Sequence, residues 1–176
     1  LELARRFPEQ PGFLDAVMYA QFDMFLAYWT EGNRDAALTS MRQAIDAVVA
    51  RKNKFPASRE SYEVHDRCVN SICAKLREDQ EFALILQVVR DYLAQTKDAR
   101  PDDLPLRSSI LAFGGRAALA VKEYAEAESI LRESMKAFDA TIPNDWQAYN
   151  IRCYVGEALL GQDKLAEAET LLTKGY

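Results

Sequence analysis

A sequence repeat near the carboxyl end is the feature that most constrains the fold. The segment EYAEAESILRES begins at Glu123 and KLAEAETLLTKG begins at Lys164, and a shift of 41 residues superposes Ala, Glu, Ala, Glu and a Leu. The same shift carries Gly115 onto Gly156. Because repeats of about 20–50 residues are typical of stacked supersecondary units, the chain is expected to be an array of similar units.

Each repeat has the periodicity of an α-helix. Apolar residues recur three and four positions apart, which predicts helices with one apolar face. Fainter copies lie upstream in NRDAALTSMRQAI, which begins at Asn33, and in EFALILQVVRDYL, which begins at Glu81. The 7 glycines and 6 prolines among 176 residues are too few for a sandwich or barrel, which needs many turns. The sequence therefore predicts an all-α fold.

Glycine and proline mark the expected ends of the helices. Gly32 and Asn33 predict a tight turn, Lys54–Ser58 a connector, and Asp98–Pro105 the longest loop. The expected helices span residues 13–30, 34–52, 59–77, 80–96, 106–121, 124–141, 145–160 and 164–174. They form four pairs, at 13–52, 59–96, 106–141 and 145–174, in one repeat domain at 13–176. Residues 1–12 are expected to be the tail of a preceding helix and a connector, as in a fragment of a longer protein.

Small residues mark where paired helices are expected to cross. Gly114, Gly115, Ala117 and Ala118 crowd one helix, and Gly156 follows in the next repeat. A glycine inside a helix costs about 1 kcal/mol relative to alanine, so a compensating gain is required. Close approach of two helix backbones provides that gain, and Gly156 is expected to face Ala168.

The alternation of small residues with a Tyr or Leu at the head of the second helix resembles the tetratricopeptide repeat. The matching residues are Leu111, Gly115, Ala118, Tyr124, Ala127 and Leu131 in the third pair, and Val155, Gly156, Leu159, Leu165, Ala168 and Leu172 in the fourth. The period of 41 exceeds the usual period of about 34, and the first two pairs are divergent. The resemblance implies a right-handed α-solenoid of about four antiparallel helix pairs.

The last third of the chain is similar to the C-terminal repeat region of the large serine/threonine kinases of planctomycete bacteria. The shared features are Asp145–Trp146, Asn150, Gly156, residues 158–162 (ALLGQ), residues 166–169 (AEAE) and Gly175–Tyr176. This resemblance implies a non-catalytic segment of a larger signalling protein. A kinase domain is expected only outside this chain, because His65-Asp66-Arg67 is not the catalytic-loop order and no Asp-Phe-Gly follows it.

The resemblance also implies a peptide-binding groove, lined by the first helix of each pair. On this geometry the groove residues are Arg67, Asn70, Arg77, Arg116, Asn150, Tyr19 and Phe22, with Leu26, Ser109, Ala112, Cys153 and Glu157 beside them. The arginines and the asparagine are suited to a carboxylate or an acidic segment. Alternatively, each arginine is simply solvated on its helix. For Trp146, a packing anchor at the start of its helix is preferred over a ligand contact.

No catalytic residue, metal or cofactor is expected. His65 and Cys68 lie three residues apart, but the chain has no second histidine and a zinc site needs more ligands. A Cys–His nucleophile also needs an orienting group and an oxyanion donor, and none is identifiable. The acid pairs Glu126/Glu128 and Glu167/Glu169 point to different helix faces and are expected to be solvated.

Charge and composition restrict the partners. The net charge of −5, without a basic block, excludes a nucleic-acid interface. Gln21 and Asp23 interrupt the apolar run Ala16–Trp29, so membrane insertion is not expected. The three cysteines lack a disulfide-framework spacing, which favours a reducing, cytoplasmic location. The chain is thus predicted to be a scaffold that binds a protein or peptide. The alternative is a structural spacer or a module that self-associates through its first helix.

Overall fold

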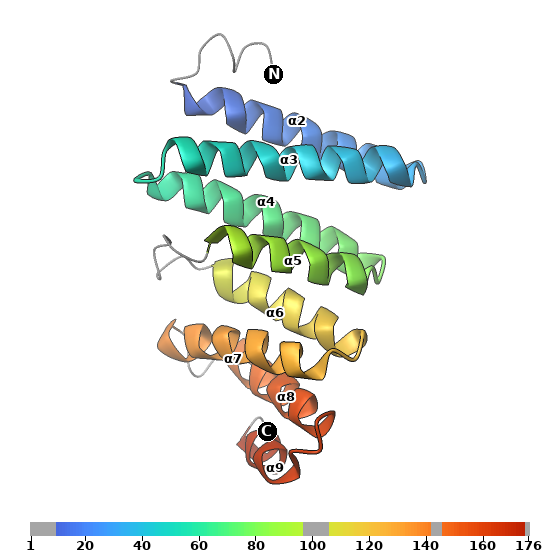
Figure 1. Cartoon of the computed structure of the whole chain (residues 1–176), viewed down its shortest axis with the longest axis vertical. Coiled ribbons are helices and arrows are strands. Elements are labelled where there is room, and N and C mark those ends of the chain that lie inside the picture. The colour runs from blue at the N-terminus through green and yellow to red at the C-terminus, as the bar shows by residue number, and fades with distance from the viewer. Residues whose placement is uncertain (1–9, 97–105, 142–145, 175–176) are drawn as a thin grey trace. The chain divides into compact units, whose positions relative to one another are not determined.

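The computed structural model describes residues 10–96, 106–141 and 146–174, and this part of the chain is helical without strands (Figure 1). The all-α prediction is therefore confirmed. The helices are α2 (Pro11–Thr30), α3 (Arg34–Lys54), α4 (Arg59–Glu78), α5 (Phe82–Thr96), α6 (Leu106–Ala120), α7 (Tyr124–Thr141), α8 (Trp146–Leu160) and α9 (Leu165–Lys174). The predicted tail at 1–9, the loop at 98–105, Asp145 and Gly175–Tyr176 lie outside the described residues.

The ends of the helices follow local chemistry. Helix α2 begins at Pro11, two residues before the expected start, because proline is tolerated in the first turn, where its missing N–H has no intrahelical partner. Helix α3 begins where expected, and the Asn33 side chain accepts a hydrogen bond from Ala36 N at 3.3 Å. This cap satisfies one of the N–H groups that the first turn of a helix leaves unpaired.

Within the described residues, one turn conformation recurs four times, between the two helices of each pair. A residue with positive φ, between 59° and 78°, occupies the same place in each turn, and the four residues are Gly32, Gln80, Lys122 and Asp163. Its N–H donates to the carbonyl three residues earlier at 3.0–3.1 Å, and the next N–H donates to the carbonyl five residues before it at 2.9–3.0 Å. These two bonds define the Schellman motif. The recurrence sets a common register for all four pairs, including the irregular second pair.

The chain divides into two compact units, and the division falls inside α4 and before the last two residues of α5. The first unit comprises residues 1–72 and 95–102, and the second comprises residues 73–94 and 103–176. In the first unit α2 packs against α3, and this packing buries Met18, Phe25 and Trp29. The prediction of a single repeat domain over 13–176 stays a prediction, as does the handedness of the solenoid.

In the second unit the predicted close approach of paired helices is confirmed. A Cβ added at Gly115 of α6 would lie 2.3 Å from Leu131 Cγ of α7. At Gly156 of α8 the added Cβ would lie 2.7 Å from Leu172 Cγ of α9, whereas the expected neighbour Ala168 contributes only its carbonyl oxygen, at 3.6 Å. Each glycine is therefore covered by a leucine one helix away.

Gly114, beside the first of these glycines, performs the same role toward the preceding pair. Its added Cβ would lie 2.5 Å from Val89 Cγ1 of α5. Adjacent glycines in α6 thus face two different helices, α5 and α7. This double contact explains why the chain has two consecutive glycines in a helix that otherwise favours alanine and leucine.

The carboxylates of the AEAE segments tie successive pairs together, and the expectation that they are solvated is wrong for Glu126 and Glu128, which are partly buried, whereas Glu167 and Glu169 are exposed as expected. Arg90 of α5 donates to both oxygens of Glu126 in α7, at 2.9 and 2.5 Å. Arg132 of α7 then donates to Glu167 of α9 at 3.2 Å. The first glutamate of each segment is therefore held by an arginine from the second helix of the preceding pair.

Glu128 of α7 is the most heavily bonded of these carboxylates. It accepts hydrogen bonds from Arg132 at 2.7 Å, from Gln162 at 2.9 Å and from Lys164 at 2.7 Å. Gln162 and Lys164 belong to the turn between α8 and α9, so Glu128 joins that turn to α7. The three bonds, of which the one from Lys164 has the largest effect, lower the pKa of Glu128 to about 2.

The described helices show no membrane-spanning segment: none of them has both the length and the apolar character needed to cross a bilayer.

Candidate functional site

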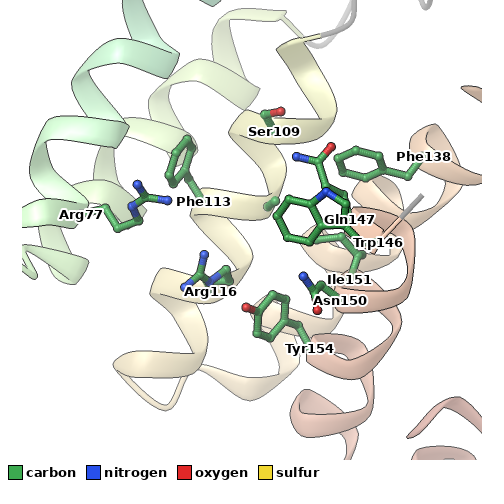
Figure 2. Close-up of a pocket in the computed structure, with 11 residues that line it drawn as sticks. Arg77, Ser109, Phe113, Arg116, Phe138, Trp146, Gln147, Asn150, Ile151 and Tyr154 are labelled. Atoms are coloured by element: carbon green, nitrogen blue, oxygen red, sulfur yellow. The ribbon is translucent and has the colours of Figure 1, made fainter. Parts of the chain in front are cut away.

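A pocket opens on the surface of the second unit between α6 and α8 (Figure 2). Arg77 from α4 and Phe138 from α7 complete its wall. The residues that line it are Arg77, Ser109, Ala112, Phe113, Arg116, Phe138, Trp146, Gln147, Asn150, Ile151 and Tyr154. Residues from four helices, separated by as many as 77 positions between Arg77 and Tyr154, therefore converge on one site.

Helical spacing explains why α6 and α8 supply most of the lining. On α6, Ser109, Ala112 and Arg116 are three and four residues apart, so they follow one another along a single face. On α8, Trp146 and Asn150 repeat this spacing, and Tyr154 continues it. Two such stripes facing each other form the walls of the pocket.

Two arginines of the pocket lie against aromatic rings. The guanidinium carbon of Arg77 lies 5.3 Å from the ring centroid of Phe113, and that of Arg116 lies 5.0 Å from the ring centroid of Tyr154. Figure 2 shows both guanidinium groups on the same side of the pocket, extending toward the space next to Phe113. Contact with a ring restrains a guanidinium and leaves its N–H edge available to a ligand.

The pocket is electropositive. No aspartate or glutamate lines it, and neither Arg77 nor Arg116 forms an ion pair with any residue that the structure describes. Every other arginine of the second unit contacts a carboxylate, and these arginines are Arg90, Arg107, Arg132 and Arg152. The two pocket arginines are thus the exceptions among the described arginines of the second unit.

The rim and the floor of the pocket have opposite character. Trp146 is 67% exposed at the rim, so the preferred interpretation of this residue as a packing anchor is wrong. Its ring is accessible, which agrees with the alternative interpretation that Trp146 contacts a ligand. Phe138 and Ile151, which also line the pocket, are buried. An exposed indole above an apolar floor is suited to a partly apolar ligand with a polar end.

The size of the pocket favours an amino-acid side chain over a cofactor or a drug-sized molecule as its ligand. Its volume is about 180 Å³, below the range of about 300–1,000 Å³ that is usual for pockets holding drug-sized molecules or cofactors. The space fits one or two amino-acid side chains. A smaller cavity shares Arg77, Phe113 and Arg116 with it and adds Phe82, Ile85 and Ala117.

The seven residues predicted from the sequence divide between the two units. Arg77, Arg116 and Asn150 line the pocket, together with Ser109 and Ala112. The other four lie in the first unit: Arg67 and Tyr19 are exposed, and Asn70 and Phe22 are half-buried. The Phe22 ring contacts that of Phe25, with centroids 6.0 Å apart. These four residues form no part of the described pocket, and neither do Leu26, Cys153 and Glu157, which were also expected in the groove.

The sequence analysis missed the aromatic part of the site. Phe113 and Tyr154 support the two arginines, and neither was selected as a site residue. A helical register drawn through Arg116 and Asn150 would have found them, because Phe113 is three residues before the first and Tyr154 is four after the second.

The first unit contains a buried polar cluster centred on Arg51. This arginine is 1% exposed, and it donates to Ser61 Oγ at 2.8 Å. It also forms ion pairs with Asp15 at 2.7 Å and Glu60 at 3.0 Å. Burial raises the pKa of Asp15, and the opposing charge of Arg51 limits that rise. The cluster connects α2, α3 and α4 and has the contacts of a structural ion-pair network.

His65 and Cys68, the residues weighed for metal binding or nucleophilic catalysis, are buried in the same unit. Burial raises the pKa of the Cys68 thiol to about 12, which keeps the thiol protonated at neutral pH, whereas a nucleophile must be a thiolate. In the described ranges no three His, Cys, Asp or Glu side chains come together as a group able to hold a metal ion.

Comparison with known proteins gives no assignment: no protein-family model matches the chain, and no curated protein matches its sequence significantly.

Proposed function

We propose that this chain is a non-catalytic scaffold that binds a protein or peptide, and that it holds an acidic segment of its partner in the pocket between α6 and α8. The observation that carries the proposal is the pairing of Arg77 and Arg116, each against an aromatic ring and neither neutralised by a carboxylate of the described chain. Two cations in one pocket without an acidic neighbour favour a negatively charged ligand.

The form of the pocket supports a peptide rather than a small cofactor. At about 180 Å³ it is too small for most cofactors, but it suits a side chain of a segment that continues over the surface. Trp146 at the rim offers an exposed ring for a neighbouring side chain of the segment. Helical repeats commonly present such sites to extended peptides.

The sequence resemblances agree with this proposal. A tetratricopeptide-type array and the repeat region of a bacterial serine/threonine kinase both imply a role in binding proteins within a larger signalling protein. The four identical turns between paired helices are the structural counterpart of the sequence repeat. The kinase association itself remains a proposal that rests on residues of the last third of the chain.

A fluorescence titration tests the proposal. The chain has two tryptophans, so Trp29→Phe leaves Trp146 as the single reporter at the rim of the pocket. A short peptide with two glutamates beside a leucine should change this emission and bind in a saturable way, whereas the same peptide with two lysines should not. Equal binding of the two peptides, or no saturable change with the acidic one, would contradict the proposal.

Charge reversal then locates the ligand. Arg77→Glu and Arg116→Glu should each weaken binding of the acidic peptide by about tenfold or more, because each removes a charge-assisted contact and adds repulsion. Arg42→Glu is the matched control, since Arg42 is exposed in α3 of the first unit. Circular dichroism should show the same helix content in all three variants.

Self-association is the second candidate, and exposed apolar side chains on α2 favour it. Tyr19 is 53% exposed and Met24 is 40% exposed, although both belong to the most apolar helix. Light scattering over a dilution series separates the candidates: a constant monomer mass that persists while the peptide binds favours the scaffold. A mass that falls on dilution, and that Met24→Glu reduces to the monomer, favours self-association.

A further inference from the structure

We infer that the group bound between Arg77 and Arg116 is a phosphate monoester on a serine or threonine side chain of the partner peptide. The inference rests on the proposed function, because it names the acidic group that the pocket takes. It distinguishes a phosphorylated segment from one that carries only aspartate or glutamate.

Charge balance is the first argument. Arg77 and Arg116 bring two positive charges to a pocket that no carboxylate lines. A single carboxylate neutralises one of them, whereas a phosphate monoester carries a charge of about −1.5 to −2 at pH 7. A phosphorylated side chain therefore neutralises both arginines from one attachment point.

The second argument is the supply of hydrogen-bond donors. Each guanidinium presents several N–H groups along a planar edge, and Asn150 and Ser109 add an amide and a hydroxyl to the same pocket. A carboxylate has two oxygens, while a phosphate monoester has three terminal oxygens that all accept hydrogen bonds. The donors of this pocket match the larger set of acceptors.

The third argument is the fixed orientation of the arginines. Phe113 and Tyr154 lie against the two guanidinium groups at 5.3 and 5.0 Å, so less side-chain entropy is lost when an anion binds. Both arginines also border the adjoining smaller cavity, which places them side by side on one wall. Two restrained guanidinium groups on one wall favour a compact dianion over two separated carboxylates.

The test uses the Trp29→Phe chain and three peptides that are identical except at one central position. That position carries phosphoserine, glutamate or serine, and the rest of each peptide is uncharged. The phosphoserine peptide should bind at least about tenfold more tightly than the glutamate peptide, and the serine peptide should bind most weakly. Inorganic phosphate alone, at millimolar concentration, should compete with the phosphoserine peptide.

Substitution of arginine by lysine tests the geometry at constant charge. Arg77→Lys and Arg116→Lys should each weaken binding of the phosphoserine peptide by about threefold to tenfold, because lysine offers no planar pair of donors. Arg42→Lys should leave the affinity unchanged. The readout is the dissociation constant together with an unchanged circular dichroism spectrum, so that loss of folding is not mistaken for loss of binding.

The pH dependence gives a signature that a carboxylate does not share. The second pKa of a phosphate monoester is about 6, so affinity for the phosphoserine peptide should fall as the pH is lowered from about 7.5 to 5. Affinity for the glutamate peptide should change little, because glutamate titrates near 4.3. The ionisable residues that line the pocket are Arg77, Arg116 and Tyr154, and no histidine, aspartate or glutamate is among the lining residues.

The outcomes separate the inference from the function on which it rests. If the glutamate and phosphoserine peptides bind equally well, the phosphate inference is wrong and the acidic-peptide scaffold stands. If neither peptide binds, the proposed function fails as well. If inorganic phosphate binds and the phosphoserine peptide binds no more tightly than the ion, the site takes a free anion and the inference of a phosphopeptide is wrong.

Discussion

Gly115 of α6 lies directly beneath the side chain of Leu131 in α7. A methyl group at Gly115 would lie 2.3 Å from Leu131 Cγ and 2.5 Å from its Cδ2, distances that a packed core does not accommodate. The residue thus has no side chain because the leucine already fills the space. The same relationship joins Gly156 to Leu172 in the last pair.

Gly115→Ala should therefore destabilise the protein by about 1–3 kcal/mol, the usual cost of overpacking, although alanine is intrinsically the better helix former by about 1 kcal/mol. Urea unfolding followed by circular dichroism measures the change. Gly12→Ala is the matched control, because nothing lies within 4 Å of a Cβ at Gly12. A variant at Gly115 as stable as the control would refute the close approach of α6 and α7.

The pKa of Glu128 predicts a loss of stability in acid. Its folded-state pKa is about 2, against an ordinary value of 4.5. Because the folded pKa is depressed, this carboxylate contributes stability above about pH 4.5 and loses that contribution as the pH falls toward 2. We expect a contribution of about 1 kcal/mol, since solvent reaches part of the carboxylate and screens the interaction.

Glu128→Gln should remove this contribution, so the stability curves of the variant and the parent should converge between pH 4.5 and 2. Thermal unfolding at a series of pH values provides the measurement. Glu169→Gln is the control: Glu169 occupies the equivalent position in α9, and its side chain is exposed. A difference between parent and Glu128→Gln that does not change with pH would contradict the assignment.

The buried ion pair between Arg51 and Asp15 predicts that substitution of Arg51 destabilises the protein. Arg51→Met leaves Asp15 without its ion-pair partner, and breaking a buried pair in this way typically costs about 3–5 kcal/mol. The pKa of Asp15, already raised by burial, should rise further. The double variant Arg51→Met/Asp15→Asn should be less destabilised than the sum of the single variants, as a double-mutant cycle by urea unfolding would measure. Additive losses would show that the two residues act independently.

The three cysteines should differ in reactivity. Cys68 and Cys73 are buried, while Cys153 is partly accessible. Iodoacetamide at pH 8 should therefore alkylate Cys153 first, and mass spectrometry of the native protein should find Cys68 modified only after denaturant is added. Burial, which raises the pKa of Cys68 to about 12, provides the physical reason, because the thiolate is the reactive form. Rapid alkylation of Cys68 in the native state would contradict its position in the core.

Local signals predicted the helices well. The ends and apolar faces of helices depend on residues within one or two turns, such as Gly32, Asn33 and the AEAE segments, so they can be predicted from the sequence. The helix expected at 80–96 begins at Phe82 instead, because Gln80 takes the positive φ of the turn and the repeat pattern is least regular there. Main-chain hydrogen bonds from Gln80 and Glu81 to the end of α4 form this turn, and such bonds do not require a characteristic side chain.

The candidate site was predicted only in part, because it depends on distances between helices. Arg77 and Arg116 were selected as groove residues, but their contacts with Phe113 and Tyr154 require the packing of α4, α6 and α8. The exposure of Trp146 is equally non-local, since an aromatic residue at the start of a helix packs or protrudes according to its neighbours. Arg67 and Asn70 satisfied the same pattern and belong to the other unit.

The four turns between paired helices, which share one conformation, have an evolutionary consequence. Two main-chain hydrogen bonds define each of these turns, and glycine, glutamine, lysine and aspartate are all found at the positive-φ position. A genetic duplication or deletion with its ends in two equivalent turns would add or remove whole helix pairs. We therefore expect chains of this kind to change in length by whole helix pairs.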